Sequence, residues 1–341
     1  MARFILSRKK AIAQFKLAKE ISDFVSYSFK TNPEVGKVLE KETDCEISMS
    51  SLAYIPLVKD KKRIWFFPQA WSESDVKALF SIGISKFVID NEKDLKTLTG
   101  FLGKNRKNAW VLLRMRLKEN TIYTGKHFVF GMTSEEINKN ILILSKNPAV
   151  EKLGIHFHRK TQNTSEWSLR EELTDSLDEE TWKAISLINI GGGLPSIYNN
   201  SKPELRSIFK KLKALKIWLN KNGIKVIIEP GRFIAAPAVT LEAEIKSISE
   251  NNITIDCSVY NCAMDTFVMN VRLIVKGENN SGRGRAYVIK GCTPDSIDIF
   301  RYKVFLPKQR VGGKITFLNA GAYNFASDFD GLPKVPTILT K

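Results

Sequence analysis

The sequence contains few cysteines and no long uninterrupted apolar run. Its four cysteines are widely spaced and lack the paired spacing of zinc ligands, which argues against a disulfide framework or a zinc site: Cys45, Cys257, Cys262 and Cys292. No stretch approaches the roughly 20 apolar residues that span a bilayer. Residues 1–7 are too short, and too soon followed by basic residues, to be a secretory signal. We therefore expect a cytoplasmic protein without a membrane span or a metal site.

Acidic residues are outnumbered by basic ones. The chain has 53 Lys and Arg against 36 Asp and Glu, a net charge of +17. So basic a chain suggests nucleic-acid binding, but the lysines are spread along the sequence and not gathered into one arm or helix. The densest basic run lies at residues 59–63. We therefore favour a solvated basic surface over nucleic-acid binding, with steering of anionic ligands as the second interpretation.

The spacing of apolar residues predicts a repeating strand–helix pattern over about the first 230 residues. Hydrophobic residues make up 43% of the chain and charged ones 26%, as in globular proteins, and 341 residues suit two domains or one barrel with an appendage. After a first strand at 4–6, eight strands are predicted at 24–29, 45–49, 64–67, 86–89, 110–114, 152–157, 187–190 and 225–228. The clearest helices are predicted at 9–20, 72–82, 92–101, 134–144 and 202–222. Eight strand–helix units predict a (β/α)8 barrel, whose functional groups gather at the C-terminal ends of its strands.

The pattern changes after Arg232. Residues 235–237, Ala-Ala-Pro, interrupt it, and Gly, Asn and Asp turns then separate the predicted strands 239–248, 253–256, 268–275, 285–289 and 314–318. We expect residues 1–234 to form the barrel and residues 235–341 to form an all-β domain, a sandwich or a barrel.

One lysine stands where a barrel would use it. The segment 27–33, Tyr-Ser-Phe-Lys-Thr-Asn-Pro, places Lys30 at the C-terminal end of the first barrel strand, before Asn-Pro opens a helix. A lysine amine in apolar surroundings can form an imine with an aldehyde and so act as a covalent catalyst. Alone, the more ordinary interpretation is a solvated lysine at a strand end.

Two later segments favour a functional role for this lysine. Residues 191–193 are three glycines directly after a predicted strand, where free backbone N–H groups suit a phosphate, although they also suit a plain tight turn. The last barrel strand ends in Glu229-Pro-Gly-Arg232. There the carboxylate can hold a ring nitrogen protonated while the guanidinium forks onto a phosphate. The alternative is a surface ion pair, which is worth little.

A histidine pair ends the sixth barrel strand. His156 and His158 share a face because side chains alternate along a strand, so one of them can stack on a planar cofactor. A strand histidine is usually a satisfied core residue, but these are two of only three in the chain. Their meeting at the barrel rim favours a functional role.

Taken in order, these motifs resemble one family. The lysine segment, the triple glycine, residues 229–232, the Asp295 segment and residues 321–323 have the order and rough spacing of the pyridoxal-phosphate-dependent ornithine/diaminopimelate/arginine decarboxylases of the alanine racemase-like fold type. The resemblance covers nearly the whole chain. Residues 154–158 also resemble the carboxynorspermidine decarboxylase branch.

The resemblance implies a pyridoxal 5′-phosphate site. Lys30 carries the cofactor as a Schiff base, His158 stacks on its ring, and Glu229 pairs with its nitrogen. The remaining cofactor-binding residues, mainly at the phosphate, are Gly192, Gly193, Gly231, Arg232 and Tyr323. Glu46 replaces the usual aspartate near the cofactor, although Asp44 competes for that alignment.

The resemblance also implies a homodimer with two shared sites. Asp295 reaches into the partner subunit's site and meets the far end of the substrate. The family usually has cysteine just before this aspartate, where it helps to protonate the intermediate, but here the residue is Pro294. Cys292, two residues earlier, cannot be assumed to replace it. The tail is shortened as well, because residues 329–331 arrive sooner than the family's aromatic-Asn-Gly segment.

The expected substrate is a basic amino acid (ornithine, lysine or arginine) or carboxynorspermidine, in polyamine synthesis, because Asp295 favours a distal cation. Diaminopimelate is the alternative, with Arg272 as a weak candidate for its distal carboxylate. An amino-acid racemase is disfavoured, since racemases of this fold generally place arginine at the ring nitrogen. A non-catalytic paralogue is the further alternative that Pro294 raises.

Overall fold

Eight parallel strands close into a barrel in the first two thirds of the chain. The computed structural model describes residues 1–116, 130–279, 282–324 and 327–341. The barrel strands follow chain order: β2 (Phe24–Ser28), β3 (Glu46–Met49), β4 (Ile64–Phe66), β5 (Lys86–Ile89), β6 (Ala109–Arg114), β7 (Val150–His156), β8 (Leu187–Asn189) and β9 (Lys225–Ile228). β2 pairs with β9 through Phe24 and Ile227 and so closes the ring. The prediction of a (β/α)8 barrel is confirmed.

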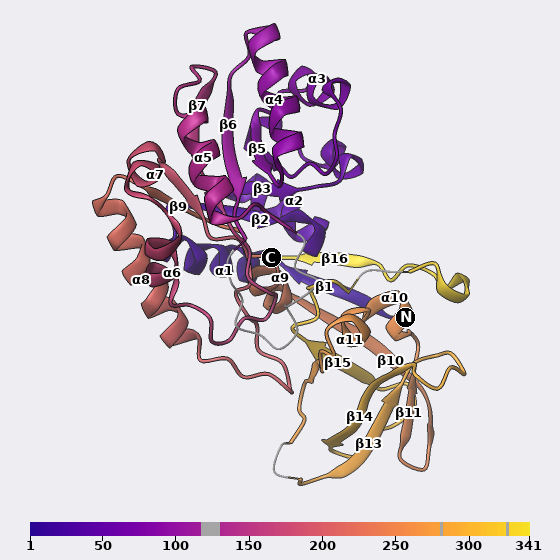
Figure 1. Ribbon diagram of the computed structural model, residues 1–341. Helices are drawn as coiled ribbons and strands as arrows, with labels where there is room; N and C mark the ends of the chain where they lie inside the picture. The colour runs from indigo at the N-terminus through magenta and orange to yellow at the C-terminus, as the bar shows by residue number, and fades with distance from the viewer. Residues whose placement is uncertain (117–129, 280–281, 325–326) are drawn as a thin grey trace.

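Helices cover the outside of the barrel (Figure 1). They are α1 (Arg8–Glu20), α2 (Pro33–Glu42), α3 (Glu73–Ser81), α4 (Glu92–Asn105), α5 (Ser134–Leu144), α6 (Leu169–Ser176), α7 (Glu179–Ala184), α8 (Leu205–Lys221) and α9 (Arg232–Ala238). Their starts are written in the sequence: Asn32 caps α2 ahead of Pro33, and Thr133 and Glu136 form a capping box on α5. The connection from β3 to β4 departs from the pattern and contains only 3-10 turns, at Leu52–Leu57 and Lys61–Arg63.

A small apolar cluster plugs the barrel. Its five buried side chains come from five different barrel strands and are separate from the main core: Trp65, Val88, Leu112, Leu187 and Ile227. Their neighbours along the strands belong to the main core instead, because successive side chains point to opposite faces of a strand. The cluster therefore fills the barrel interior and excludes water from below its C-terminal mouth.

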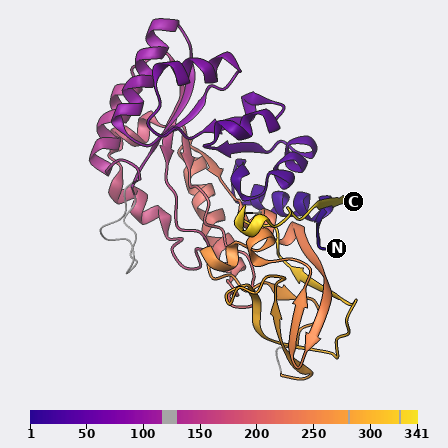
Figure 2. The same cartoon turned by 90° about the vertical axis from the view of Figure 1, so that its right-hand side faces the viewer.

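The rest of the chain forms a second, mixed sheet that lies beside the barrel as a separate lobe (Figures 1 and 2). Its main path runs in the order β12 (Ile274–Val275), β15 (Lys314–Leu318), β10 (Val239–Ser249), β11 (Asn252–Ile255), β13 (Arg285–Lys290) and β14 (Ile299–Leu306). The first strand, β1 (Arg3–Ser7), pairs antiparallel with β10 and parallel with the last strand, β16 (Thr337–Thr340). The prediction of a second, all-β unit is thus confirmed in class. The boundary expected between residues 234 and 235 falls inside α9 and stays a prediction, and the sheet also takes in residues 3–7.

Part of the strand prediction for this lobe is wrong. Residues 268–275 were expected to be one strand, but the helix α11 (Asp265–Val268) runs into them, and only Ile274 and Val275 join the sheet. Asp265 is tied to Arg232 of the barrel, and Asn270 adopts a positive φ of 51°. This tertiary contact overrides the local apolar pattern. The sequence prediction also missed β14 and β16.

Within the described ranges, we find no helix with both the length and the apolar character needed to cross a membrane.

Candidate active site

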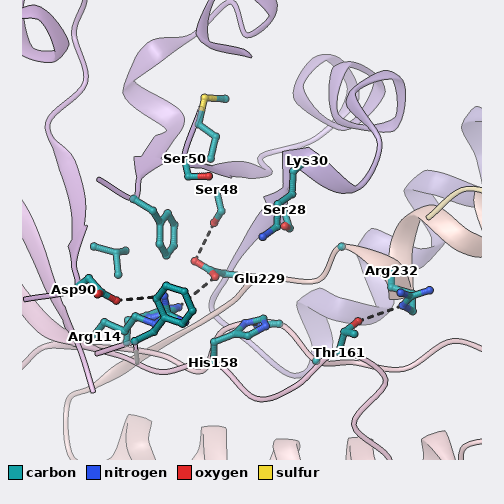
Figure 3. Close-up of a pocket in the computed structure, with 18 of the residues that line it drawn as sticks. Ser28, Lys30, Ser48, Ser50, Asp90, Arg114, His158, Thr161, Glu229 and Arg232 are labelled. Carbon is teal, nitrogen blue, oxygen red and sulfur yellow. Dashed lines mark hydrogen bonds and ion pairs between the residues drawn. The ribbon is translucent and has the colours of Figure 1, made fainter. Parts of the chain in front are cut away.

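A cavity of about 340 Å³ opens at the C-terminal ends of the barrel strands. Figure 3 shows Lys30, His158 and Glu229 facing it, with Thr161 and Arg232 toward one end and Asp90 and Arg114 toward the other. It is lined by Ser28, Lys30, Ser48, Met49, Ser50, Phe67, Pro68, Gln69, Val88, Asp90, Arg114, Phe130, His156, His158, Thr161, Gly192, Gly193, Leu194, Glu229, Gly231, Arg232 and Tyr323. Tyr323 alone in this set comes from the second lobe. The structure thus brings most of the expected residues together.

Lys30 lies two residues beyond the end of its strand, and not directly at the strand end as the sequence suggests. β2 ends at Ser28, and a 3-10 turn, Phe29–Thr31, carries the exposed lysine side chain into the cavity. The turn is anchored to the second lobe, because the Asn32 side chain donates to the Gly321 carbonyl at 3.0 Å and the Tyr323 N–H donates to the Thr31 carbonyl at 3.1 Å. This anchoring fixes the position of the amine relative to both lobes.

Glu229 is held by two hydrogen-bond donors and a histidine ring. Its Oε1 accepts from the Ser48 hydroxyl at 2.9 Å and from Asn189 Nδ2 at 2.8 Å, and its Oε2 lies 3.3 Å from His156 Nε2. Burial alone would raise the pKa of this carboxyl, but the His156 contact and the hydrogen bonds outweigh it and lower the pKa below its ordinary value. Glu229 is therefore ionised at neutral pH.

His158 turns a flat neutral ring toward the cavity. Its Nδ1 accepts a hydrogen bond from the Gly192 N–H at 3.1 Å. The side chain is exposed to the cavity, yet desolvation within the barrel mouth and the nearby His156 lower the pKa of His158 to about 4. At neutral pH the imidazole is uncharged, with its proton on Nε2, and it presents an apolar face that suits a planar ligand.

The glycine turn after β8 is packed too tightly against neighbouring residues to hold side chains. A Cβ placed on Gly192 would stand 3.0 Å from the His158 ring and 2.9 Å from the Glu229 carbonyl oxygen. Gly193 has a φ of +96°, which other residues rarely adopt. Both glycines line the cavity, so bare backbone forms this part of its wall.

Arg232 lies beside Thr161 at one end of the cavity. Its Nε donates to the Thr161 hydroxyl at 3.3 Å, and Nη1 donates to the Tyr198 hydroxyl at 3.0 Å. Its guanidinium also forms a buried ion pair with Asp265, with Nη2 3.1 Å from Oδ1, and lies 5.1 Å from the centre of the Tyr323 ring. The arginine expected at a phosphate thus already has a carboxylate partner, which the sequence interpretation missed.

A second pair missed from the sequence lies at the opposite end. Arg114, the last residue of β6, forms an ion pair with Asp90 at 3.4 Å, and the Gly131 N–H donates to the same carboxylate at 3.1 Å. Asp90 directly follows β5. The signal that singled out Lys30, a charged residue at a barrel strand's C-terminal end, would have found both.

Glu46 is not in this cavity, which corrects the expectation that it stands near the cofactor. It is the first residue of β3, so it lies at the opposite end of the barrel, where it pairs with Lys86 and accepts from the Trp65 indole. Asp44 does not reach the cavity either; it is exposed and pairs with Lys19 at 2.7 Å. At the cavity end, β3 supplies Ser48 and Met49, followed by Ser50.

Asp295 is also outside the lining of this chain's cavity. It lies partly exposed in the loop 291–298 between β13 and β14 and accepts from the Tyr260 hydroxyl at 2.8 Å. Asp298 braces the loop by accepting from the Val259 N–H at 2.9 Å. Cys292 is exposed, so its thiol is free at the loop surface.

An amine, a flat neutral ring, an ionised carboxylate and a glycine turn around one barrel mouth define a site for a planar, phosphorylated aldehyde. Comparison with known proteins agrees. Residues 9–236 match the family described as pyridoxal-dependent decarboxylase, pyridoxal binding domain, and the chain belongs to that family.

Similar proteins include the ornithine decarboxylase of Cricetulus griseus, 24% identical over 76% of this chain and 62% of the relative. The diaminopimelate decarboxylase of Archaeoglobus fulgidus is 22% identical over 87% of this chain and 75% of the relative. The crystal structure of lysine/ornithine decarboxylase from Vibrio vulnificus complexed with cadaverine covers 100% of this chain and 95% of that chain, with a TM-score of 0.80 and 21% identity. The chain thus spans about three fifths of the Cricetulus griseus ornithine decarboxylase, and the solved structure supports the fold.

The family's cofactor is pyridoxal phosphate, and the residues present fit it. Gly192 and Gly193 present bare backbone to the cavity, Lys30 supplies an amine, and Glu229 retains acceptor capacity beside the flat His158 ring. Thr161, Arg232 and Tyr323 meet at the end where a phosphate would lie.

The buried Arg232–Asp265 pair gives a testable prediction. Asp265→Asn leaves Arg232 buried without its counter-ion, and breaking such a pair costs about 3 to 5 kcal/mol of unfolding free energy. A phosphate can take the place of the lost carboxylate. We therefore expect millimolar phosphate or pyridoxal phosphate to raise the melting temperature of Asp265→Asn more than that of the wild type.

The matched control for this melting experiment is Asp44→Asn, which removes an exposed ion pair. Equal phosphate responses in Asp265→Asn and the wild type would contradict the assignment of this end to a phosphate.

Proposed function

We propose that the protein is a pyridoxal-phosphate-dependent decarboxylase that acts on a basic amino acid or a carboxylated polyamine. The observation that carries the proposal is the convergence of Lys30, His158 and Glu229 on one cavity whose far end holds Thr161 and Arg232. When bound, the cofactor supplies a ring that accepts the electrons left behind as the α-carboxylate departs as carbon dioxide.

The cavity residues take different roles in the proposed cofactor site. Lys30 Nζ would hold the cofactor through its aldehyde carbon. Glu229, which is ionised, accepts from the ring N–H and keeps that nitrogen protonated. The neutral imidazole of His158 packs against a ring face. Gly192 and Gly193, with the phosphate-end residues Gly231, Arg232 and Tyr323, hold the phosphate.

The proposed assembly is a homodimer with shared sites. Asp295 stands on a partly exposed loop outside its own cavity, which suits a residue that enters the partner's site. Its carboxylate would select a substrate with a distal cation, such as ornithine, lysine, arginine or carboxynorspermidine. Polyamine synthesis in the cytoplasm is the setting that this substrate class suggests.

Diaminopimelate is the less favoured substrate. Its distal carboxylate needs an unpaired cation, and Arg272 lies over the Tyr302 ring at 5.4 Å and does not line the described cavity. Arg114 does line it, but its charge faces Asp90.

A substrate panel tests the proposal. Purified protein loaded with pyridoxal phosphate is incubated with ornithine, lysine, arginine, diaminopimelate and carboxynorspermidine, and carbon dioxide is measured. We expect release from at least one of ornithine, lysine, arginine and carboxynorspermidine, whose distal cation has no carboxylate beside it. A protein that binds the cofactor yet is inert toward the whole panel would instead be the non-catalytic paralogue that Pro294 suggests.

A further inference from the structure

Glu229 contacts a second histidine, His156, to which the family resemblance assigns no role. The His156 side chain is 2% exposed, and its Nε2 lies 3.3 Å from Glu229 Oε2. A carboxylate offers about four acceptor positions on its two oxygens. Ser48 and Asn189 occupy the two on Oε1, and His156 occupies one on Oε2. One position on Oε2 therefore remains for a donor in the cavity.

The surroundings of His156 decide where its proton lies. Its Nδ1 is buried and has no hydrogen-bond partner among the described residues. With the proton on Nε2, the ring donates to Glu229 and leaves only a bare lone pair at Nδ1. With the proton on Nδ1, a donor is buried without an acceptor, and the Nε2 lone pair faces a carboxylate. An unmet buried donor costs more than an unmet acceptor with a free lone pair, so the first tautomer is favoured.

We propose that His156 is a positioning residue: its Nε2–H donates to Oε2 of Glu229, holds that carboxylate ionised, and turns its last acceptor position toward the cavity. The identity of the donor that fills this position, the cofactor's ring nitrogen, rests on the proposed function. The tautomer and the charge state belong to the chain alone and are testable without cofactor.

The charged and titratable groups that face His156 define its response to pH. They are Glu229 beyond β9, Arg114 on β6, Asp90 after β5 and His158, two residues beyond the end of β7; the Phe67 ring also meets it edge-on at 5.3 Å. Burial lowers the pKa of His156, and Glu229 offsets this only in part. The imidazole is thus neutral above its ordinary pKa of about 6.5, and the lowered pKa of Glu229 keeps the carboxylate charged over the same range.

The direction of the pH effect follows. Glu229 has a lowered folded-state pKa, so its contribution to stability is present above its ordinary pKa and is lost as the pH falls through the folded value. Removing the His156 donor takes away one of the contacts that lower the pKa of Glu229 against the effect of burial, so this pKa rises. The acidic limb of every property that needs this carboxylate ionised then moves to higher pH.

The first experiment uses the cofactor-free protein. The chain has three histidines, so ¹⁵N-histidine labelling gives three sets of ring signals, and the set lost in His156→Gln identifies His156. We expect a neutral ring protonated at Nε2 at pH 7.5. A ring protonated at Nδ1, or an imidazolium, would overturn the proposal.

The second experiment compares two substitutions in the loaded enzyme. In His156→Gln an amide N–H can still donate to Glu229, whereas His156→Leu removes the donor and keeps an apolar side chain. We expect the acidic limb of the bound-cofactor absorbance, and that of kcat, to move up by about one pH unit or more in His156→Leu. In His156→Gln both acidic limbs should stay near their wild-type positions.

Two outcomes separate this inference from the proposed function. If His156→Leu and His156→Gln share the wild-type pH profile, the inference fails although decarboxylation stands. If the wild type shows the Nε2–H tautomer but releases no carbon dioxide from any substrate, the proposed function fails and the hydrogen bond to Glu229 stands.

Discussion

Lys30→Ala is expected to lower decarboxylation by roughly a thousandfold or more, because the amine that holds the cofactor is gone. The visible absorbance of the bound cofactor should disappear with it. Lys30 is exposed to the cavity and its backbone is anchored by Asn32 and Tyr323, so truncating its side chain should leave the fold and the melting temperature little changed.

Two further variants sharpen this test. Lys30→Arg keeps the positive charge but has no primary amine to condense with an aldehyde, so it should be as inactive as the alanine variant. Lys16→Ala, which removes an exposed lysine of α1, should behave as the wild type. After borohydride treatment of the wild type, peptide mapping should find the pyridoxyl group on the peptide that contains Lys30. A pyridoxyl group on another lysine would refute the assignment.

The barrel could be predicted because its elements follow local rules. Each barrel strand is a short apolar run, and helices such as α5 begin at cap residues that can be recognised in the sequence. The predicted strands match those of the structure to within a few residues, and helix 202–222 begins only three residues late, at Leu205. Where the chain departs from the pattern, as at residues 268–275, a buried contact between Asp265 and Arg232 decides the outcome.

The errors at the site have a common physical cause. Glu46 and Ser48 are two residues apart on one strand, yet only Ser48 lines the cavity, because the strand runs from the floor of the barrel to its mouth. Because all strands of a parallel barrel run toward its mouth, a residue at the start of a strand, as Glu46 is, lies away from the cavity. By contrast, the Asp265 partner of Arg232 lies 33 residues away in another lobe, and no local pattern reports such a contact.

The same limit applies to Asp295, whose proposed role depends on a second copy of the chain. Asp295→Ala is expected to lose at least about a hundredfold in kcat/KM, because a carboxylate that pairs with a distal cation in a closed site contributes several kcal/mol. The loss should be far smaller for a substrate analogue without the distal amine. Asp298 braces the loop by accepting from the Val259 and Thr293 N–H groups, contacts that do not use the Asp295 side chain, so the variant should fold.

Mixing variants tests the shared site directly. Lys30→Ala and Asp295→Ala chains that exchange at random give about half hybrid dimers, each with one intact site of two, so about one quarter of the wild-type activity should return. The matched control mixes Lys30→Ala with Glu229→Gln. Both lesions lie in a chain's own cavity, so no hybrid has an intact site and no activity should return. Hybrid dimers seen by mass spectrometry without recovered activity in the first mixture would mean that Asp295 does not serve the partner's site.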